Sequence, residues 1–240
     1  MTRMVDLVAD LGEGFGAYTL GDDAALLDIV SSANIACGFH AGDPDIMDAT
    51  VAACVARGVA VGAHPSFPDL RGFGRRAMDC SAAEVRTDVT YQMGALSAFA
   101  AFHGTRVAHV APHGRLGNLV GTRADYAAAV ADAAAGVDPG LIIVAQDGEL
   151  AQAARIRGLA VGIVGIADRA YQDNGTLVPG HSPARSSTTP PRWPGARCGW
   201  SLTAKSKAST ASISRSRRTA CCCTATTPAP WRLPGSSAPS

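Results

Sequence analysis

Side chains capable of proton transfer or metal binding recur in this sequence directly after short apolar runs. They comprise three carboxylates, three imidazoles and one amide: Asp10, Glu13, Asn34, His40, His64, His113 and Asp168. Carboxylates and imidazoles move protons near neutral pH, and both bind divalent ions. Because one such residue is often only a helix cap or a buried core histidine, the grouping, and not any single member, predicts a site.

Asp10, His40 and His64 are the candidate metal ligands, since neutral imidazoles and a carboxylate suit zinc, manganese or iron. They lack the HxH or HExxH spacing of common metal motifs, so acid–base chemistry without a metal stays open. Arg71, Arg75 and Arg76 follow His64 and favour binding of a carboxylate or phosphate, although they could instead solvate a loop.

The elements that must position these residues form an alternating pattern of Val- and Ile-rich runs and helical segments, which indicates βα units and a parallel sheet. Expected strands span 5–11, 33–37, 59–63, 107–110, 141–145 and 159–164, and expected helices span 22–30, 44–57, 81–103, 123–135 and 148–157. In a parallel barrel the carboxyl ends of the strands meet at one mouth. The candidate residues are therefore expected to converge there.

Composition divides the 240 residues at Pro179. All 20 Asp and Glu residues precede this position, whereas 180–240 contain nine Lys and Arg residues and no acid. We expect a catalytic domain over 1–179 and a low-complexity basic tail over 180–240. The acidic N-terminus and the lack of a long apolar run predict a cytoplasmic protein that contacts no membrane, and nucleic acid is not an expected partner.

Five strings in the first 179 residues together carry a family resemblance: DLVADLGEGFG (6–16), SANIACGFHAGDP (32–44), GAHPSFPDLRGFGRR (62–76), PHG (112–114) and ADRAY (167–171). Their order and spacing resemble the LamB/YcsF family of 5-oxoprolinase A subunits. The resemblance implies an irregular (β/α) barrel, TIM-like and of the glycoside hydrolase/deacetylase type. It also implies ATP-dependent opening of 5-oxo-L-proline to L-glutamate together with B and C subunits.

The resemblance gives the candidate residues roles. Asp10, Glu13, His40, His64, His113 and Asp168 would supply acid–base or metal-binding groups, and Asn34, Arg75, Arg76 and Arg169 would bind substrate. ATP would be a cosubstrate, with Mg²⁺ accompanying it or a separate ion at the site.

Four positions depart from the family pattern: Val8 replaces Asn, Ala111 replaces Lys, Gly117 replaces Tyr and Val164 replaces Glu. Loss of charge from a barrel mouth weakens electrostatic catalysis, so impaired activity is one expectation. The alternatives are a metal-dependent, deacetylase-like hydrolase and a non-catalytic binding subunit.

The tail has two interpretations. It is a disordered basic extension, or it is the family sequence translated out of frame. When triplets begin at the third base of each codon, the segment from Ala220 allows V-L-L-H-G-D-N-P-G-A-V, which resembles a late motif of the family. On this interpretation the barrel lacks its native C-terminal closing unit, residues from about 181 onward lack stable structure or pack poorly, and sheet edges are exposed.

Overall fold

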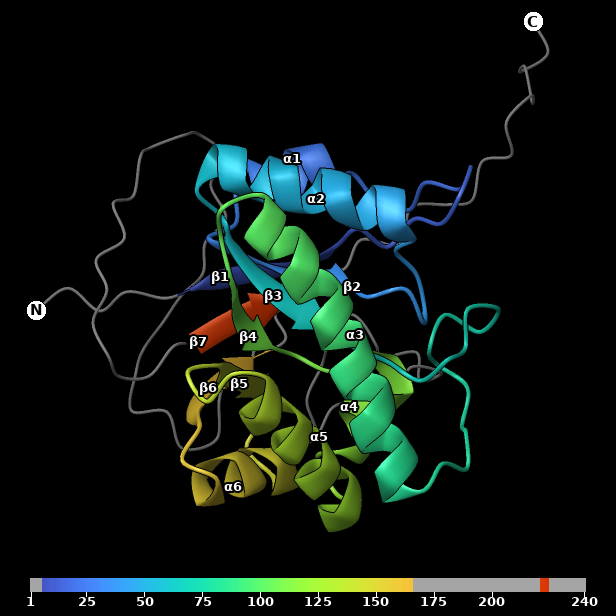
Figure 1. Cartoon of the computed structure of the whole chain (residues 1–240), viewed down its shortest axis with the longest axis vertical. Coiled ribbons are helices and arrows are strands. Elements are labelled where there is room, and N and C mark those ends of the chain that lie inside the picture. The colour runs from blue at the N-terminus through green and yellow to red at the C-terminus, as the bar shows by residue number, and fades with distance from the viewer. Residues whose placement is uncertain (1–5, 166–220, 225–240) are drawn as a thin grey trace, which may run out of the picture.

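Parallel strands arranged as a closed barrel form the centre of this computed structural model, which describes residues 6–165 and 221–224 (Figure 1). Each strand pairs with the next in sequence order, and the last pairs with the first. The strands are β1 (Leu7–Leu11), β2 (Ser32–Ala36), β3 (Ala60–His64), β4 (Val107–Val110), β5 (Ile142–Ala145), β6 (Ala160–Gly165) and β7 (Cys221–Thr224).

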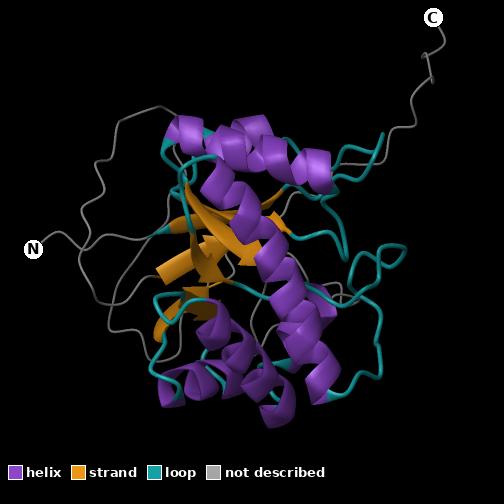
Figure 2. Ribbon diagram, in the orientation of Figure 1, coloured by secondary structure: helices purple, strands orange, loops and turns teal. Residues whose placement is uncertain are grey.

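Helices cover the outside of the strands (Figure 2). They are α1 (Asp23–Leu27), α2 (Pro44–Arg57), α3 (Ala82–Phe102), α4 (Gly114–Leu119), α5 (Ala124–Val137) and α6 (Glu149–Ile156). Helix α3 packs against α5, and α5 packs against α6. Their inner faces and the strands share one apolar core, which includes Ile35, Val89, Leu96 and Ile143. No helix in the described ranges is long and apolar enough to cross a membrane.

Helix boundaries follow the capping residues that the sequence offers. The Asp43 carboxylate accepts a hydrogen bond from the Ile46 backbone N–H, and Pro44 occupies the first helical position, where its missing N–H costs nothing. Ser81 and Glu84 form a capping box at the start of α3, at the place where the sequence predicts that a helix begins. The predicted α/β barrel is therefore confirmed, together with the helix starts that position its loops.

Strand β7 corrects one expectation. The edges of β6 and β1 were expected to be exposed, but β7 pairs in parallel with both, joining Val164 to Cys222 and Val8 to Thr224. Pairing on both sides satisfies backbone groups that an open edge would leave to solvent. The four residues of β7 belong to the segment expected to lack stable structure or to pack poorly, and their backbone pairing contradicts the first of these alternatives at 221–224. The remainder of 180–240 lies outside the described residues.

Helix α4 was not predicted from the sequence. It begins after His113, and its six residues include Gly114 and Gly117, which weaken the helical signal. A Cβ atom at position 117 would overlap the carbonyl oxygen of Pro112. The glycine that departs from the family pattern therefore fits the local backbone of this chain.

Candidate active site

Four residues in register form a layer inside the barrel. Asp10 on β1 lies opposite Asn34 on β2, Asn34 opposite Gly62 on β3, and Gly62 opposite His109 on β4. The β3–β4 ladder shifts between Val61 and Gly62, an irregularity of the kind that redirects side chains near active sites. Because Gly62 has no side chain, the imidazole of His109 occupies the space in front of it.

A hydrogen-bonded chain crosses this layer. His109 Nε2 donates to Asn34 Oδ1 at 2.8 Å, and Asn34 Nδ2 donates to Asp10 Oδ1 at 2.9 Å. Burial lowers the pKa of His109 to about 4, so the ring is neutral at neutral pH. The chain holds Asp10 beside His64, whose Nε2 lies 3.4 Å from Asp10 Oδ1.

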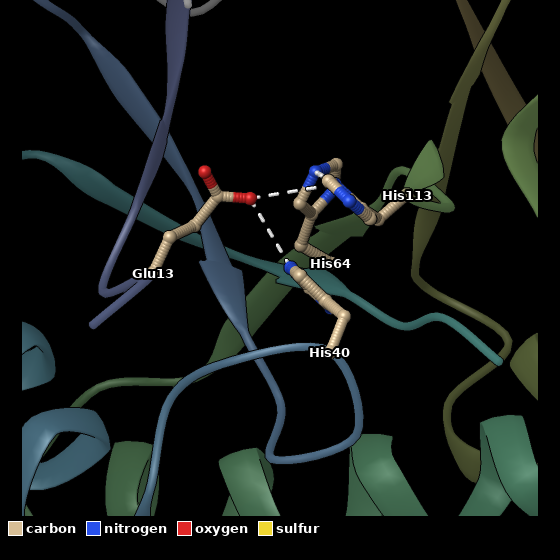
Figure 3. Close-up of side chains that lie close together, drawn as sticks. All are labelled: Glu13, His40, His64 and His113. Atoms are coloured by element: carbon tan, nitrogen blue, oxygen red, sulfur yellow. Dashed lines mark hydrogen bonds and ion pairs between the residues drawn. The ribbon is translucent and has the colours of Figure 1, made fainter. Parts of the chain in front are cut away.

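Above this layer, one carboxylate and three imidazoles converge (Figure 3). Glu13 Oε1 lies 3.1 Å from His40 Nε2 and 3.3 Å from His113 Nδ1. His113 Nδ1 lies 2.9 Å from His64 Nε2. The rings of His40 and His113 stack with centroids 3.8 Å apart. We refer to Glu13, His40, His64 and His113 as the mouth cluster.

Backbone carbonyl groups fix two of the rings. His64 Nδ1 donates to the Ala111 carbonyl oxygen at 2.5 Å, and His113 Nε2 donates to the Phe73 carbonyl oxygen at 2.9 Å. Phe73 has a φ of 54°, a conformation uncommon for a residue with a side chain. Its ring makes edge contacts with both His40 and His113. Local backbone strain at this position is consistent with a functional site.

Electrostatic interactions shift the pKa values of Asp10 and of the mouth cluster in different directions. Burial alone would raise the pKa of Asp10, but His64 and Asn34 outweigh it and hold this pKa well below its usual range. Burial would lower the pKa of His64, yet the Asp10 carboxylate outweighs it, and the net shift is upward. Asp10 is therefore ionised at neutral pH, and His64 is the ring of the cluster that most readily carries charge.

The pKa of each of the other three groups of the cluster is shifted in the direction of its neutral form. Burial is the main cause that raises the pKa of Glu13, although electrostatic interactions with His113 and His64 oppose it. The pKa values of His40 and His113 lie well below the usual range, because burial and neighbouring imidazoles oppose a further positive charge. The Glu13 side chain is 14% exposed and connects the buried cluster to solvent.

The loop 65–76 after β3 closes over the cluster and is fastened at two points. Gln92 on α3 is fully buried, and its amide exchanges two hydrogen bonds of 2.9 Å with the backbone of Ser66. Asp69 accepts from the Gly72 N–H and from the Arg76 guanidinium. Arg75 lies over the Phe73 ring at 5.3 Å. Arg76 thus holds its own loop, whereas Arg75 lies beside the cluster.

The structure brings six of the ten predicted site residues together. Asp10, Glu13, Asn34, His40, His64 and His113 form the layer and the cluster above it. Asp168 and Arg169 lie outside the described residues. His109 was missed because the strand 107–110 was interpreted as apolar. The alternation of inward-facing residues in a barrel strand was the signal that could have identified it.

Three of the four positions that depart from the family pattern meet at one place. Val8, Ala111 and Val164 form with Val144 a small apolar cluster separate from the main core, and all four are buried. Residues expected to be Asn, Lys and Glu have thus been replaced together by apolar ones. Joint replacement leaves no buried charge without a partner, so it is compatible with a stable barrel.

Comparison with known proteins gives consistent matches. The LamB/YcsF family profile matches residues 5–193. The 5-oxoprolinase A subunit of Methylococcus capsulatus is 52% identical over 180 residues, covering 75% of this chain and 69% of the relative. One of the 5-oxoprolinase A subunits of Pseudomonas syringae pv. tomato is 51% identical over 176 residues, covering 73% of this chain and 69% of the relative.

A solved structure also matches. The lactam utilization protein from Thermus thermophilus superimposes with a TM-score of 0.75 at 45% identity, covering 78% of this chain and 76% of that one. Fold and site together define a parallel α/β barrel with an acid–histidine cluster at the carboxyl ends of its strands. The chain belongs to the LamB/YcsF family.

Proposed function

We propose that this chain is a 5-oxoprolinase A subunit, whose barrel mouth binds 5-oxo-L-proline and assists its ATP-dependent opening to L-glutamate in a complex with B and C subunits. The convergence of Glu13, His64 and His113 at the mouth carries the proposal. The names of relatives about half identical to this chain supply the substrate class.

The proposed reaction overcomes the poor reactivity of a five-membered lactam. Transfer of the γ-phosphoryl group of ATP to the carbonyl oxygen makes the ring carbon a better electrophile. Water adds to that carbon, the ring C–N bond breaks, and the nitrogen takes a proton. This leaves an acyl phosphate, and its hydrolysis by a second water releases L-glutamate and phosphate. ADP is the other product.

This chain's residues fit the proton transfers in that sequence. Glu13, with a raised pKa and partial exposure, would exchange the proton with the attacking water or the ring nitrogen. Asp10 stays ionised and orients His64. Arg75 would bind the substrate carboxylate. Asp168 and Arg169 are proposed to act in the same site on the basis of the family resemblance.

The first test measures L-glutamate and ADP formed from 5-oxo-L-proline and ATP by the chain reconstituted with B and C subunits. Glu13→Gln should lower kcat by about 100-fold or more, because it removes a general acid–base group. His103→Gln is the control, since His103 pairs with Asp48 away from the cluster. Full activity of the Glu13→Gln complex would exclude this role.

We further propose that the apolar cluster of Val8, Ala111, Val144 and Val164 lowers the rate of this chain relative to its family. The double variant Ala111→Lys/Val164→Glu restores both charges together and should raise kcat. Each single variant buries an unpaired charge and should instead destabilise the barrel. If the double variant folds and turns over no faster than the wild type, the apolar cluster is not the cause of a lowered rate.

A metal-dependent, deacetylase-like hydrolase is the second candidate, favoured by the three imidazoles facing one carboxylate. This candidate requires hydrolysis without ATP, whereas the 5-oxoprolinase proposal requires ATP consumption. Assembly with the B and C subunits but no turnover under either condition would instead indicate a binding subunit.

A further inference from the structure

The spacing of the mouth cluster matches that of ligands around a single ion. A tetrahedral ion with bonds of about 2.05 Å separates its ligand atoms by about 3.3 Å. Three pairs of inward-facing atoms in the cluster are 2.9, 3.1 and 3.3 Å apart. All four ligand atoms lie within 4.8 Å of one another. The side chains thus lie close to the arrangement that an ion would require.

The backbone partners of two rings point to the same conclusion. His64 and His113 each donate their outward N–H to a carbonyl oxygen, so in the neutral rings the inward nitrogens carry lone pairs. These lone pairs face each other at 2.9 Å. Metal-binding histidines typically have this second hydrogen bond, which fixes the tautomer and the ring orientation.

Two opposing lone pairs need a positive charge between them. A proton on His64 would satisfy its contact with His113 but would leave Glu13 Oε1 facing the same His113 nitrogen at 3.3 Å. An ion bound to all three groups satisfies every contact at once. A cation shared by the three groups therefore fits these contacts.

We propose that Glu13, His40, His64 and His113 bind one divalent transition-metal ion, with Zn²⁺ the best match to a set of three imidazoles and one carboxylate. The carboxylate of this set is Glu13, whereas the sequence pattern favoured Asp10. Asp10 Oδ1 lies 3.4 Å from the same inward nitrogen, His64 Nε2, and the Ala111 carbonyl orients that ring from its outer side. When bound, such an ion acts as a Lewis acid toward a carbonyl oxygen or water. The metal proposal shares Glu13 with the lactam proposal, and a Glu13 bound to the ion would serve as a ligand and not as the proton-exchanging group.

The four ligands should contribute unequally. Binding through His40 Nε2 leaves the other ring nitrogen, Nδ1, buried without a hydrogen-bond partner among the described residues. The outer nitrogens of His64 and His113 have carbonyl partners. His40 is therefore the weakest of the three imidazole ligands, and its loss should cost the least affinity.

The test strips the full-length chain with a chelator and titrates it with Zn²⁺ and Co²⁺, measuring bound metal and the visible absorption of four-coordinate Co²⁺. One ion per chain is expected. His64→Gln and His113→Gln should weaken binding by about 100-fold or more, and His40→Gln by about 10-fold. His103→Gln, outside the cluster, should bind like the wild type.

Circular dichroism of each variant separates loss of a ligand from loss of the fold, and Glu13→Gln, at the partly exposed edge, provides a variant with little packing to disturb. A chain that retains neither Zn²⁺ nor Co²⁺, or a His64→Gln variant with wild-type affinity, would overturn the proposal. The first result would mean that a proton on His64 fills the gap between the rings. None of these readouts depends on turnover, so metal binding and 5-oxoprolinase activity can fail separately.

Discussion

Replacing Asn34 by leucine tests whether the buried chain from His109 to Asp10 holds the site together. Asn34 is 1% exposed and bridges the two groups through its amide. Leucine has nearly the same size but bonds to neither. The buried His109 N–H then loses its acceptor, which costs about 1–3 kcal/mol, and Asp10 loses a charge-assisted bond worth about 1.5–3 kcal/mol. Allowing about 1 kcal/mol for the gain in apolar burial, the free energy of unfolding should fall by about 3 kcal/mol.

Urea unfolding of the full chain, followed by far-ultraviolet circular dichroism, measures this loss. The double variant Asn34→Leu/His109→Phe replaces both members of one hydrogen bond with apolar groups. It should therefore lose less than the sum of its single variants. Strictly additive losses would show that Asn34 and His109 are not coupled. A loss below about 0.5 kcal/mol for Asn34→Leu would refute the reasoning, because surface substitutions without a partner have effects of that size.

Three further predictions concern the same framework. Gly62→Ala should lower the free energy of unfolding by about 1–3 kcal/mol, because the added Cβ overlaps the His109 ring. The loss should be smaller in a His109→Ala background, and equal losses in the two backgrounds would contradict the overlap. Ser81→Ala removes the capping box of α3 and should lower the free energy of unfolding by about 1 kcal/mol. An unchanged midpoint of urea unfolding would contradict this. Between pH 6.5 and 4 the unfolded chain protonates His109 while the native chain does not. The free energy of unfolding therefore falls by up to roughly 3 kcal/mol as the pH is lowered through that window. His109→Gln should remove that part of the slope, and an unchanged slope would show that His109 is not buried as a neutral ring.

The elements that the sequence predicted well are those with local chemical signals. Asp43 followed by Pro44, and Ser81 followed three residues later by Glu84, mark helix starts that the structure confirms, because capping depends only on neighbouring backbone groups. The strands were found from apolar runs, since a parallel sheet is buried on both faces. Helix α4 lacked such signals and was missed.

The site was predicted in outline and not in detail. Strand ends converge in any parallel barrel, so the meeting of Glu13, His40, His64 and His113 follows from topology. The partners within the group depend on register and on the absence of a side chain at Gly62, which local sequence does not reveal. This is why His109 was missed and why Glu13, rather than Asp10, faces the three imidazoles.

The closing strand shows a similar limit. Residues 221–224 have no strand periodicity that sets them apart from the rest of the tail, yet they pair with β6 and β1. Vacant backbone donors and acceptors on both neighbouring strands favour pairing with little regard to side-chain type. Sequencing of the DNA from codon 175 onward tests the proposed change of frame: a shifted frame that encodes the family motif without a stop codon is expected, and a stop codon or an unrelated sequence in that frame would exclude it.

The most direct test of the central claim is the conversion of 5-oxo-L-proline to L-glutamate by the chain reconstituted with B and C subunits, comparing wild type with His64→Gln. His64 contacts Asp10 and His113, and its pKa is raised by the buried Asp10 carboxylate against the effect of burial. We expect ATP-dependent glutamate formation by the wild type and a loss of about 100-fold or more in an assembled His64→Gln complex. Equal rates in the two complexes would contradict it.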